Sequence, residues 1–98
     1  MLKRGKKANS QERINIDYPK SAEAVFSPHY AVRITAAPCE TVEVSVDGGP
    51  YASCHNSAGH WWYHLNGLTE GAHKLAARVK ISGETAFALR KFEVQKSR

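Results

Sequence analysis

The chain has 98 residues, enough for one small domain with a single modest core. With 42% hydrophobic and 23% charged residues and a net charge of +5, its composition excludes a collagenous or wholly disordered protein. No stretch approaches the roughly 18 uncharged apolar residues of a membrane helix, and no apolar segment follows the charged start. We therefore expect neither a membrane span nor a signal peptide, and a cytoplasmic location unless the chain is an excised domain.

The position of the charges bears on nucleic-acid binding, which a basic protein always suggests. Residues 1–13 carry a net charge of +4 and residues 90–98 one of +3, whereas residues 14–89 carry −2. We therefore expect no basic face on the folded body. The lysine-rich start buries too little apolar surface to order itself, so residues 1–13 are predicted to be a disordered tail, and residues 96–98 a disordered end. Nucleic acid would bind only through that tail.

From Ile14 onward, apolar residues recur at every second position, the period of half-buried strands, and no segment shows a helical stripe. Strands are expected, in chain order, at 14–18, 30–36, 41–46, 51–54, 60–65, 72–81 and 85–94. Asp47-Gly48-Gly49 predicts a tight hairpin turn, because glycine adopts positive φ without steric cost. Residues 19–28 and 55–59 are expected to be loops. About seven antiparallel strands without helices predict an all-β sandwich of two sheets over residues 14–95.

The last expected strand carries apolar residues of both parities. Phe87 and Leu89 share one parity, whereas Phe92 and Val94 share the other. If both pairs are buried, the strand needs an extra residue to turn its second half over. We therefore expect a β-bulge near Arg90.

Several of these motifs together resemble a known class of domain. They are Val-Glu-Val-Ser-Val-Asp-Gly-Gly at 42–49, a following Trp-x-Tyr strand, Gly71-x-His73-x-Leu75-x-x-Arg78-Val79, and Gly83. Their order resembles bacterial immunoglobulin-like and fibronectin type III-like β-sandwich domains, and is most similar to the immunoglobulin-like dimerisation domain of sulfite-oxidase-type molybdenum enzymes. The resemblance covers residues 14–94. It implies an immunoglobulin-like sandwich that binds a partner or itself. It implies no cofactor and no redox activity, because the molybdopterin site belongs to a different domain.

Five histidines and two cysteines raise the question of a metal site. The tightest group, Cys54, His55 and His60, lacks the repeated short ligand spacing of structural zinc sites. His60 and His64 would lie about 13 Å apart on a strand, too far to share one ion. We therefore expect no metal. Free thiols are favoured, although a bridge from Cys39 to Cys54 stays open.

The sequence does not favour an enzyme. Asp47, Cys54 and His73 can be drawn as a nucleophilic triad, but nothing in their spacing requires it and no strand-turn-helix elbow holds a nucleophile. Paired carboxylates for glycoside hydrolysis are unsupported, and no glycine-rich loop precedes a helix. We predict no catalytic residue. His73 is instead expected to be structural, with a ring nitrogen donating to a loop carbonyl, and pH sensing is the alternative.

The aromatic strand at 60–65 provides the candidate contact surface. Trp61, Tyr63 and Leu65 share one parity and are assigned to the core, although the opposite parity would exchange the two tryptophans. The residues left on the outer face are His60, Trp62 and His64.

An outward tryptophan between two imidazoles is typical of an interface anchor, because the indole buries much area with few rotatable bonds. We predict binding of a protein partner or of a second copy, as in a homodimer, with Trp62, His60, His64 and Tyr51 as contacts. Two alternatives stay open. The neighbouring loop could cover Trp62, or the indole could stack on a sugar in a carbohydrate-binding module.

Overall fold

The structure is a computed structural model, and it describes residues 13–95. Its strands are β1 (Ile14–Tyr18), β2 (Glu23–Val25), β3 (Tyr30–Ala36), β4 (Val42–Val46), β5 (Ala52–Ser53), β6 (His55–Ser57), β7 (His60–Leu65), β8 (Gly71–Ile81) and β9 (Glu84–Val94). No helix in this described part is long and apolar enough to cross a membrane. The expected tail and C-terminal end lie outside the described residues, apart from Arg13.

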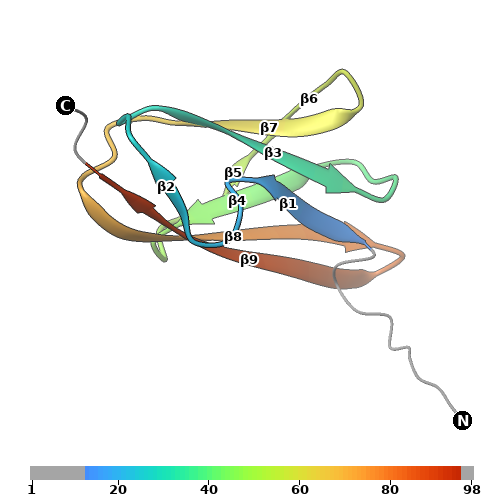
Figure 1. Cartoon of the computed structure of the whole chain (residues 1–98). Helices are drawn as coiled ribbons and strands as arrows, with labels where there is room; N and C mark the ends of the chain where they lie inside the picture. The colour runs from blue at the N-terminus through green and yellow to red at the C-terminus, as the bar shows by residue number, and fades with distance from the viewer. Residues whose placement is uncertain (1–12, 96–98) are drawn as a thin grey trace, which may run out of the picture.

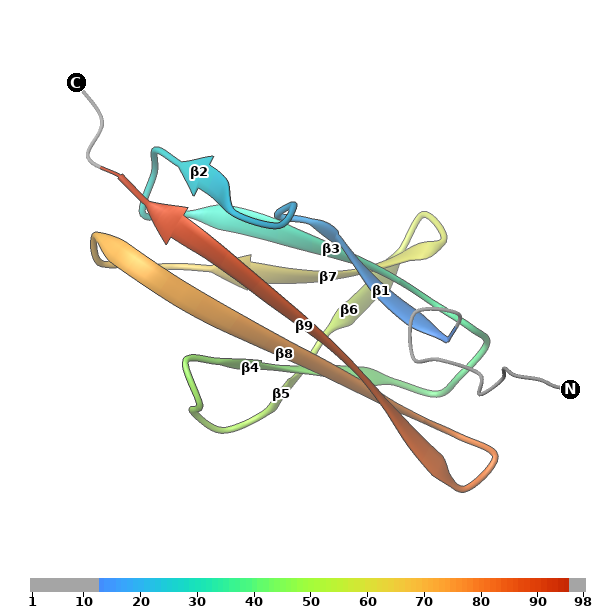
Figure 2. The same ribbon diagram turned by 60° about the horizontal axis from the view of Figure 1, so that its bottom comes forward.

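The strands form two layers, which confirms the predicted all-β sandwich (Figure 1). One sheet has four strands in the order β1-β3-β7-β6, and the other has five in the order β2-β9-β8-β4-β5. Neighbouring strands are antiparallel except β2, which runs parallel to the end of β9. The N-terminal segment therefore contributes to both sheets, and Figure 2 shows β2 beside the end of β9.

The core lies between the sheets and consists mainly of aliphatic side chains at alternate strand positions. Its largest fully buried aliphatic members are Ile14, Ile16, Val32 and Ile34 from the four-stranded sheet, with Val42, Val44, Leu75 and Val79 from the other. Burying each such side chain contributes about 1.5–3 kcal/mol. Trp61 and Tyr63 pack partly buried against this cluster, on the inner side that the strand's parity predicts.

Two short strands occupy segments that were expected to be loops. β2 lies within 19–28, and β6 lies within 55–59, where it forms a hairpin with β7 that pairs His55 with Trp62. All three β6 side chains are exposed. The expectation of a loop was wrong because a fully exposed edge strand needs no apolar alternation, the signal used to find strands.

β8 and β9 pair without interruption from Gly71 opposite Val94 to the turn at their far end. The bulge expected near Arg90 is absent from this described ladder. It was predicted on the assumption that both apolar pairs are buried. Instead, continuous pairing buries Phe92 and Val94 and turns Phe87 and Leu89 outward.

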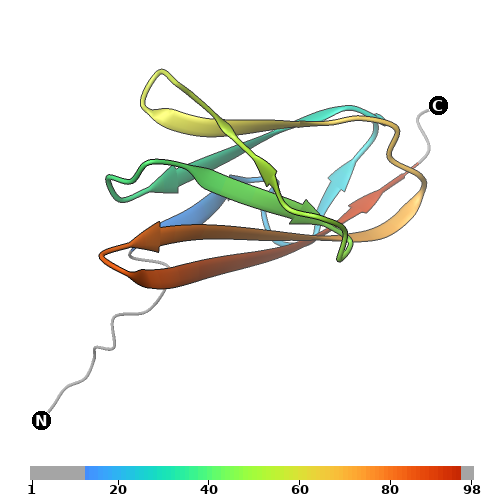
Figure 3. The ribbon, with the colours of Figure 1, turned by 180° about the vertical axis from the view of Figure 1, so that it is seen from behind.

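Two connections determine how β4, β5 and β6 follow one another: the turn between β4 and β5, and the crossover from β5 to β6. Asp47 and Gly48 have positive φ, and the N–H of Gly49 donates to the carbonyl of Val46 at 2.9 Å, which confirms the tight turn. From β5 the chain crosses to the other sheet and continues as β6, as Figure 3 shows. Arg13, just before β1, forms an ion pair with Glu84 at the start of β9, with 2.9 Å between the guanidinium and the carboxylate.

Candidate functional site

The outer side of the four-stranded sheet carries most of the predicted contact residues. We call it the β1–β3–β7 face, and define it by Asp17, Arg33, Thr35, His60, Trp62 and His64. The pairing of β3 with β7 sets Arg33 opposite Trp62 and Ala31 opposite His64. Since side chains alternate across a sheet, these residues face away from the buried Val32 and Ile34.

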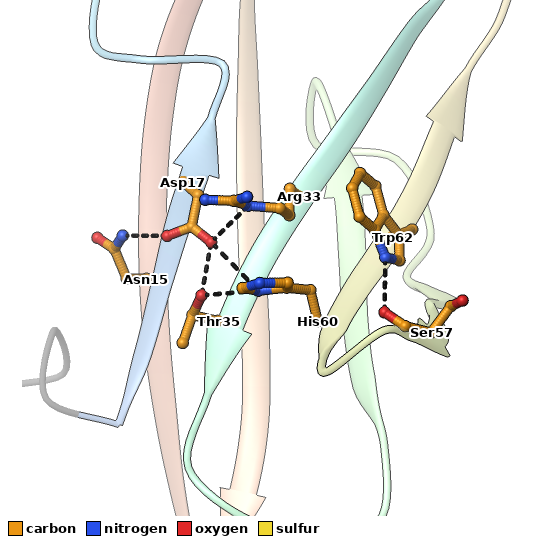
Figure 4. Close-up of polar contacts among 7 residues, drawn as sticks. All are labelled: Asn15, Asp17, Arg33, Thr35, Ser57, His60 and Trp62. Carbon is orange, nitrogen blue, oxygen red and sulfur yellow. Dashed lines mark hydrogen bonds and ion pairs between the residues drawn. The ribbon is translucent and has the colours of Figure 1, made fainter.

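Asp17 is the centre of a polar network on this face (Figure 4). Its Oδ2 accepts from Arg33 Nε at 3.1 Å and from Thr35 Oγ1 at 2.5 Å, and its Oδ1 accepts from Asn15 Nδ2 at 2.8 Å. His60 Nδ1 lies 3.2 Å from the Thr35 hydroxyl. Burial by itself raises the pKa of Asp17, but the three hydrogen bonds outweigh it and hold the pKa below its ordinary value. The network is therefore built around a carboxylate anion.

Trp62 lies beside this network and is half-buried. Its indole Nε1 donates to the carbonyl of Ser57 at 3.0 Å, and the His60 ring meets it edge-on, 6.3 Å between ring centres (Figure 4). The indole is thus held by the backbone of the β6–β7 hairpin. Trp62 was expected either to be exposed on the outer face or to be covered by the neighbouring loop. In the structure it lies on the outer side of the sheet, and the β6–β7 hairpin covers part of its ring.

The structure brings Trp62, His60 and His64 to one face, and it places Tyr51 elsewhere. Tyr51 lies just before β5, and its ring centre lies 3.7 Å from the guanidinium carbon of Arg78 in the five-stranded sheet. Grouping it with the other three was wrong, because the chain changes sheets between β5 and β6.

The sequence analysis did not single out three side chains of this face: Asp17, Arg33 and Thr35. The alternation in β3 places Arg33 and Thr35 outward, which is a usable signal. Asp17 shares the outward parity of Asn15 in β1, opposite the buried Ile14 and Ile16. Its partners in β3 depend on a shift in the pairing between Ile16 and Tyr18, which alternation does not encode.

The two cysteines are free thiols, Cys39 half-buried and Cys54 buried. Burial, with the charge of Glu43, raises the pKa of Cys54 to about 12, so this thiol is protonated near neutral pH. Among residues 13–95, no three His, Cys, Asp or Glu side chains gather closely enough to hold a metal ion.

Of the residues considered as a triad, Asp47 and His73 do meet, with 2.6 Å between Oδ2 and Nδ1. Cys54 lies at the other end of the hairpin, where its N–H donates to the Val42 carbonyl. The second ring nitrogen of His73 lies 2.6 Å from the Thr69 carbonyl oxygen, the kind of contact that was predicted for a structural histidine.

Comparison with known proteins supports the architecture. No protein-family model matches the chain, and no curated protein matches it. Among solved structures, the fibronectin(III)-like modules of Clostridium thermocellum CbhA match with a TM-score of 0.71 and 20% identity, over 87% of this chain and 98% of that one. The fold is that of a fibronectin type III-like or immunoglobulin-like sandwich.

Two further matches are to parts of much longer chains. An endo-beta-1,4-mannanase from Thermotoga petrophila matches with a TM-score of 0.72 and 17% identity, over 87% of this chain and 20% of that one. An engineered protein matches at 0.70 and 17% identity, over 84% and 20%. The chain thus spans about a fifth of each. These matches support the broad sandwich class, and they do not show the narrower resemblance to the sulfite-oxidase-type dimerisation domain.

Proposed function

We propose that this domain is a non-catalytic interaction module that associates with a second copy of itself through the β1–β3–β7 face. The observation that carries the proposal is the balanced charge of that face. Asp17 and Arg33 contribute one charge of each sign beside the half-buried Trp62. Because a two-fold interface must be complementary to itself, a face with paired opposite charges and an aromatic anchor suits it better than a face of one sign.

The state of the polar groups also favours recognition over catalysis. The Asp17 carboxylate already accepts hydrogen bonds from Asn15, Arg33 and Thr35, and its lowered pKa makes it a poor proton acceptor near pH 7. A charge fixed by several donors loses little conformational freedom on binding. The resemblance of the sequence motifs to a dimerisation domain agrees with the same role.

The test is the solution mass measured by light scattering over a range of protein concentrations. Arg33→Glu makes the face acidic and Asp17→Lys makes it basic, so each variant alone should repel its own copy and remain monomeric, whereas the two mixed together should form a heterodimer. Glu70→Lys, a charge reversal on an exposed loop, is the matched control and should dimerise as the unchanged chain does. An unchanged chain that stays monomeric at every concentration rejects self-association, and dimers of both single variants reject this face.

A second candidate is carbohydrate binding at the same face. It is favoured by an indole standing beside a fixed carboxylate and guanidinium, a combination of stacking surface and polar groups that suits sugars. Titration with manno- and cello-oligosaccharides, followed by tryptophan fluorescence, should shift the emission of the unchanged chain. Trp62→Phe separates the signal of Trp62 from that of Trp61. An emission unchanged across the panel rejects this candidate.

A further inference from the structure

The outer side of the five-stranded sheet carries a second patterned surface, which we call the β8–β9 face. Continuous pairing of the two strands arranges it in four consecutive cross-strand rows: Lys74 with Lys91, Ala76 with Leu89, Arg78 with Phe87, and Lys80 with Thr85. The sequence interpretation expected no basic face on the folded body. Pairing of the two strands nevertheless brings three lysines of one hairpin, Lys74, Lys80 and Lys91, to this side of the sheet.

The first row places two lysines directly opposite each other, an arrangement that is destabilising by itself. Asp47, which lies beside this row, is already engaged, because its Oδ2 lies 2.6 Å from His73 Nδ1 and its Oδ1 accepts from the backbone N–H of Lys74 at 2.8 Å. Lys74 and Lys91 border a shallow cavity of about 320 Å³, together with Asp47, Ala72 and His73. This row therefore suits a carboxylate from another molecule.

The two middle rows are apolar at their β9 ends. Leu89 is 73% exposed and Phe87 is 47% exposed, so two large apolar side chains stand side by side between cationic rows. Arg78 adds little charge to them, because its Nε lies 2.7 Å from the Glu43 carboxylate and its guanidinium lies over the Tyr51 ring. The middle of the face is thus an apolar strip, and the cation within these two rows, Arg78, is neutralised by Glu43.

The fourth row restores positive charge with Lys80, which borders a second shallow cavity of about 560 Å³. Among the described residues, no carboxylate lies within ion-pair distance of Lys80 or Lys91. Successive rows are two residues apart, so the lysine rows stand about 20 Å apart at roughly 3.3 Å per residue. In an extended peptide, the side chains on one side also recur at every second residue, so they match the spacing of successive rows.

We propose that the β8–β9 face binds an extended acidic segment of a partner protein, with a carboxylate at each end of a short apolar stretch. A segment with acidic residues at its first and seventh positions and apolar residues at its third and fifth matches the four rows. This surface lies on the sheet opposite the one proposed for self-association, so the two proposals can fail independently.

Charge complementarity selects this occupant over others. A second copy of the same face would set lysines against lysines. An anionic membrane would also meet the carboxylates around the strip, Glu43 on one side and the exposed Glu93 at its end. A narrow extended segment that covers only the four rows leaves Glu43, on β4, and Glu93, one row beyond Lys91, in water.

The test is a titration of the ¹⁵N-labelled chain with the peptide Glu-Ser-Leu-Ser-Leu-Ser-Glu, followed by amide chemical shifts. We expect shifts confined to the amides of β8 and β9, with binding weakened at higher salt. The double variant Lys80→Glu/Lys91→Glu should bind at least about tenfold more weakly, and Leu89→Thr should bind more weakly while keeping a strand-forming residue. Lys20→Glu, a single charge reversal of the same kind on an exposed loop, is the control and should bind as the unchanged chain does.

Three results would overturn the proposal. One is no shift at about 1 mM peptide, and another is equal binding of a peptide with glutamine in place of both glutamates. The third is lysine-dependent binding to phosphatidylserine vesicles without peptide binding, which would assign the face to a membrane. Spectra recorded in the absence of peptide show whether each variant is folded, so a folding defect is not mistaken for lost binding.

Discussion

Asp47 and His73 form a short pair, with 2.6 Å between Oδ2 and Nδ1, while His73 Nε2 lies equally close to the Thr69 carbonyl oxygen. A carbonyl oxygen can only accept, and so can an ionised carboxylate, so both ring nitrogens carry a proton and donate. The ring also stacks on Phe92, with 5.6 Å between centres. A positively charged imidazole therefore ties the β4–β5 turn, the loop before β8 and the end of β9 together.

This pair should make the stability of the domain depend on pH. The hydrogen bond to Thr69, followed by the one to Asp47, raises the pKa of His73 above its ordinary value near 6.5 despite partial opposition from burial. The stabilisation is therefore fully present below about pH 6.5 and is lost as the pH rises through the folded-state pKa. We expect the urea midpoint to fall between about pH 6 and pH 9, and to fall less in His73→Gln. His55→Gln, at an exposed histidine, should keep the full dependence, and an equal dependence in His73→Gln would contradict the assignment.

Alternation predicted the long elements well because each has one buried face. β3 and β8 were placed to within one residue, since Val32 and Ile34 in β3, like Leu75 and Val79 in β8, must share one side. β2 could not be found in this way. It has three residues, and it forms by pairing with the distant end of β9, a long-range contact that no local pattern encodes.

The candidate site was predicted only in part for a similar reason. Side chains alternate along a strand, so a buried Leu65 places His60, Trp62 and His64 together on the outer face of β7. The partners of His60 depend on the strand register. Asp17 reaches the network at a shift in the pairing of β1 with β3, and this detail of the backbone follows from the packed structure rather than from residue types.

Gly48 should be needed for the hairpin between β4 and β5. Its φ is +77°, a conformation that costs an L-residue about 1–2 kcal/mol. We expect Gly48→Ala to lower the free energy of unfolding by about 1 kcal/mol, measured by urea denaturation. Gly48→Asn is the control, because asparagine tolerates this region better and should lose less. Equal stability of the Ala variant and the unchanged chain would show that the turn relaxes to another type.

The two thiols should differ in reactivity. Burial raises the pKa of both thiols, that of Cys54 to about 12, but Cys39 is half-buried and therefore more accessible than the buried Cys54. We expect a thiol-specific reagent near pH 8 to label one cysteine quickly and the other only when the domain opens. Cys39→Ser should remove the fast phase and leave the slow one, and Cys54→Ser should do the reverse. Rapid labelling of the Cys39→Ser variant would show that Cys54 is accessible in the folded state.

Asp17→Asn should remove the anion from the centre of the β1–β3–β7 face. The Asp17 side chain is 14% exposed and that of Arg33 is 32% exposed, so water screens the pair in part, and we expect a loss of about 1 kcal/mol at pH 7. Hydrogen bonds lower the folded-state pKa of Asp17, so its contribution is present above the unfolded value near 3.9 and is lost as the pH falls through the folded value.

The stability difference between the unchanged chain and Asp17→Asn should therefore shrink as the pH is lowered from about 5 to about 2, when measured by urea unfolding. Glu70→Gln removes a carboxylate from an exposed loop and should give no such difference at any pH. A constant difference across the range would mean that the asparagine changes packing rather than charge. In that case the carboxylate would have no electrostatic role in ordering Arg33, Thr35 and His60.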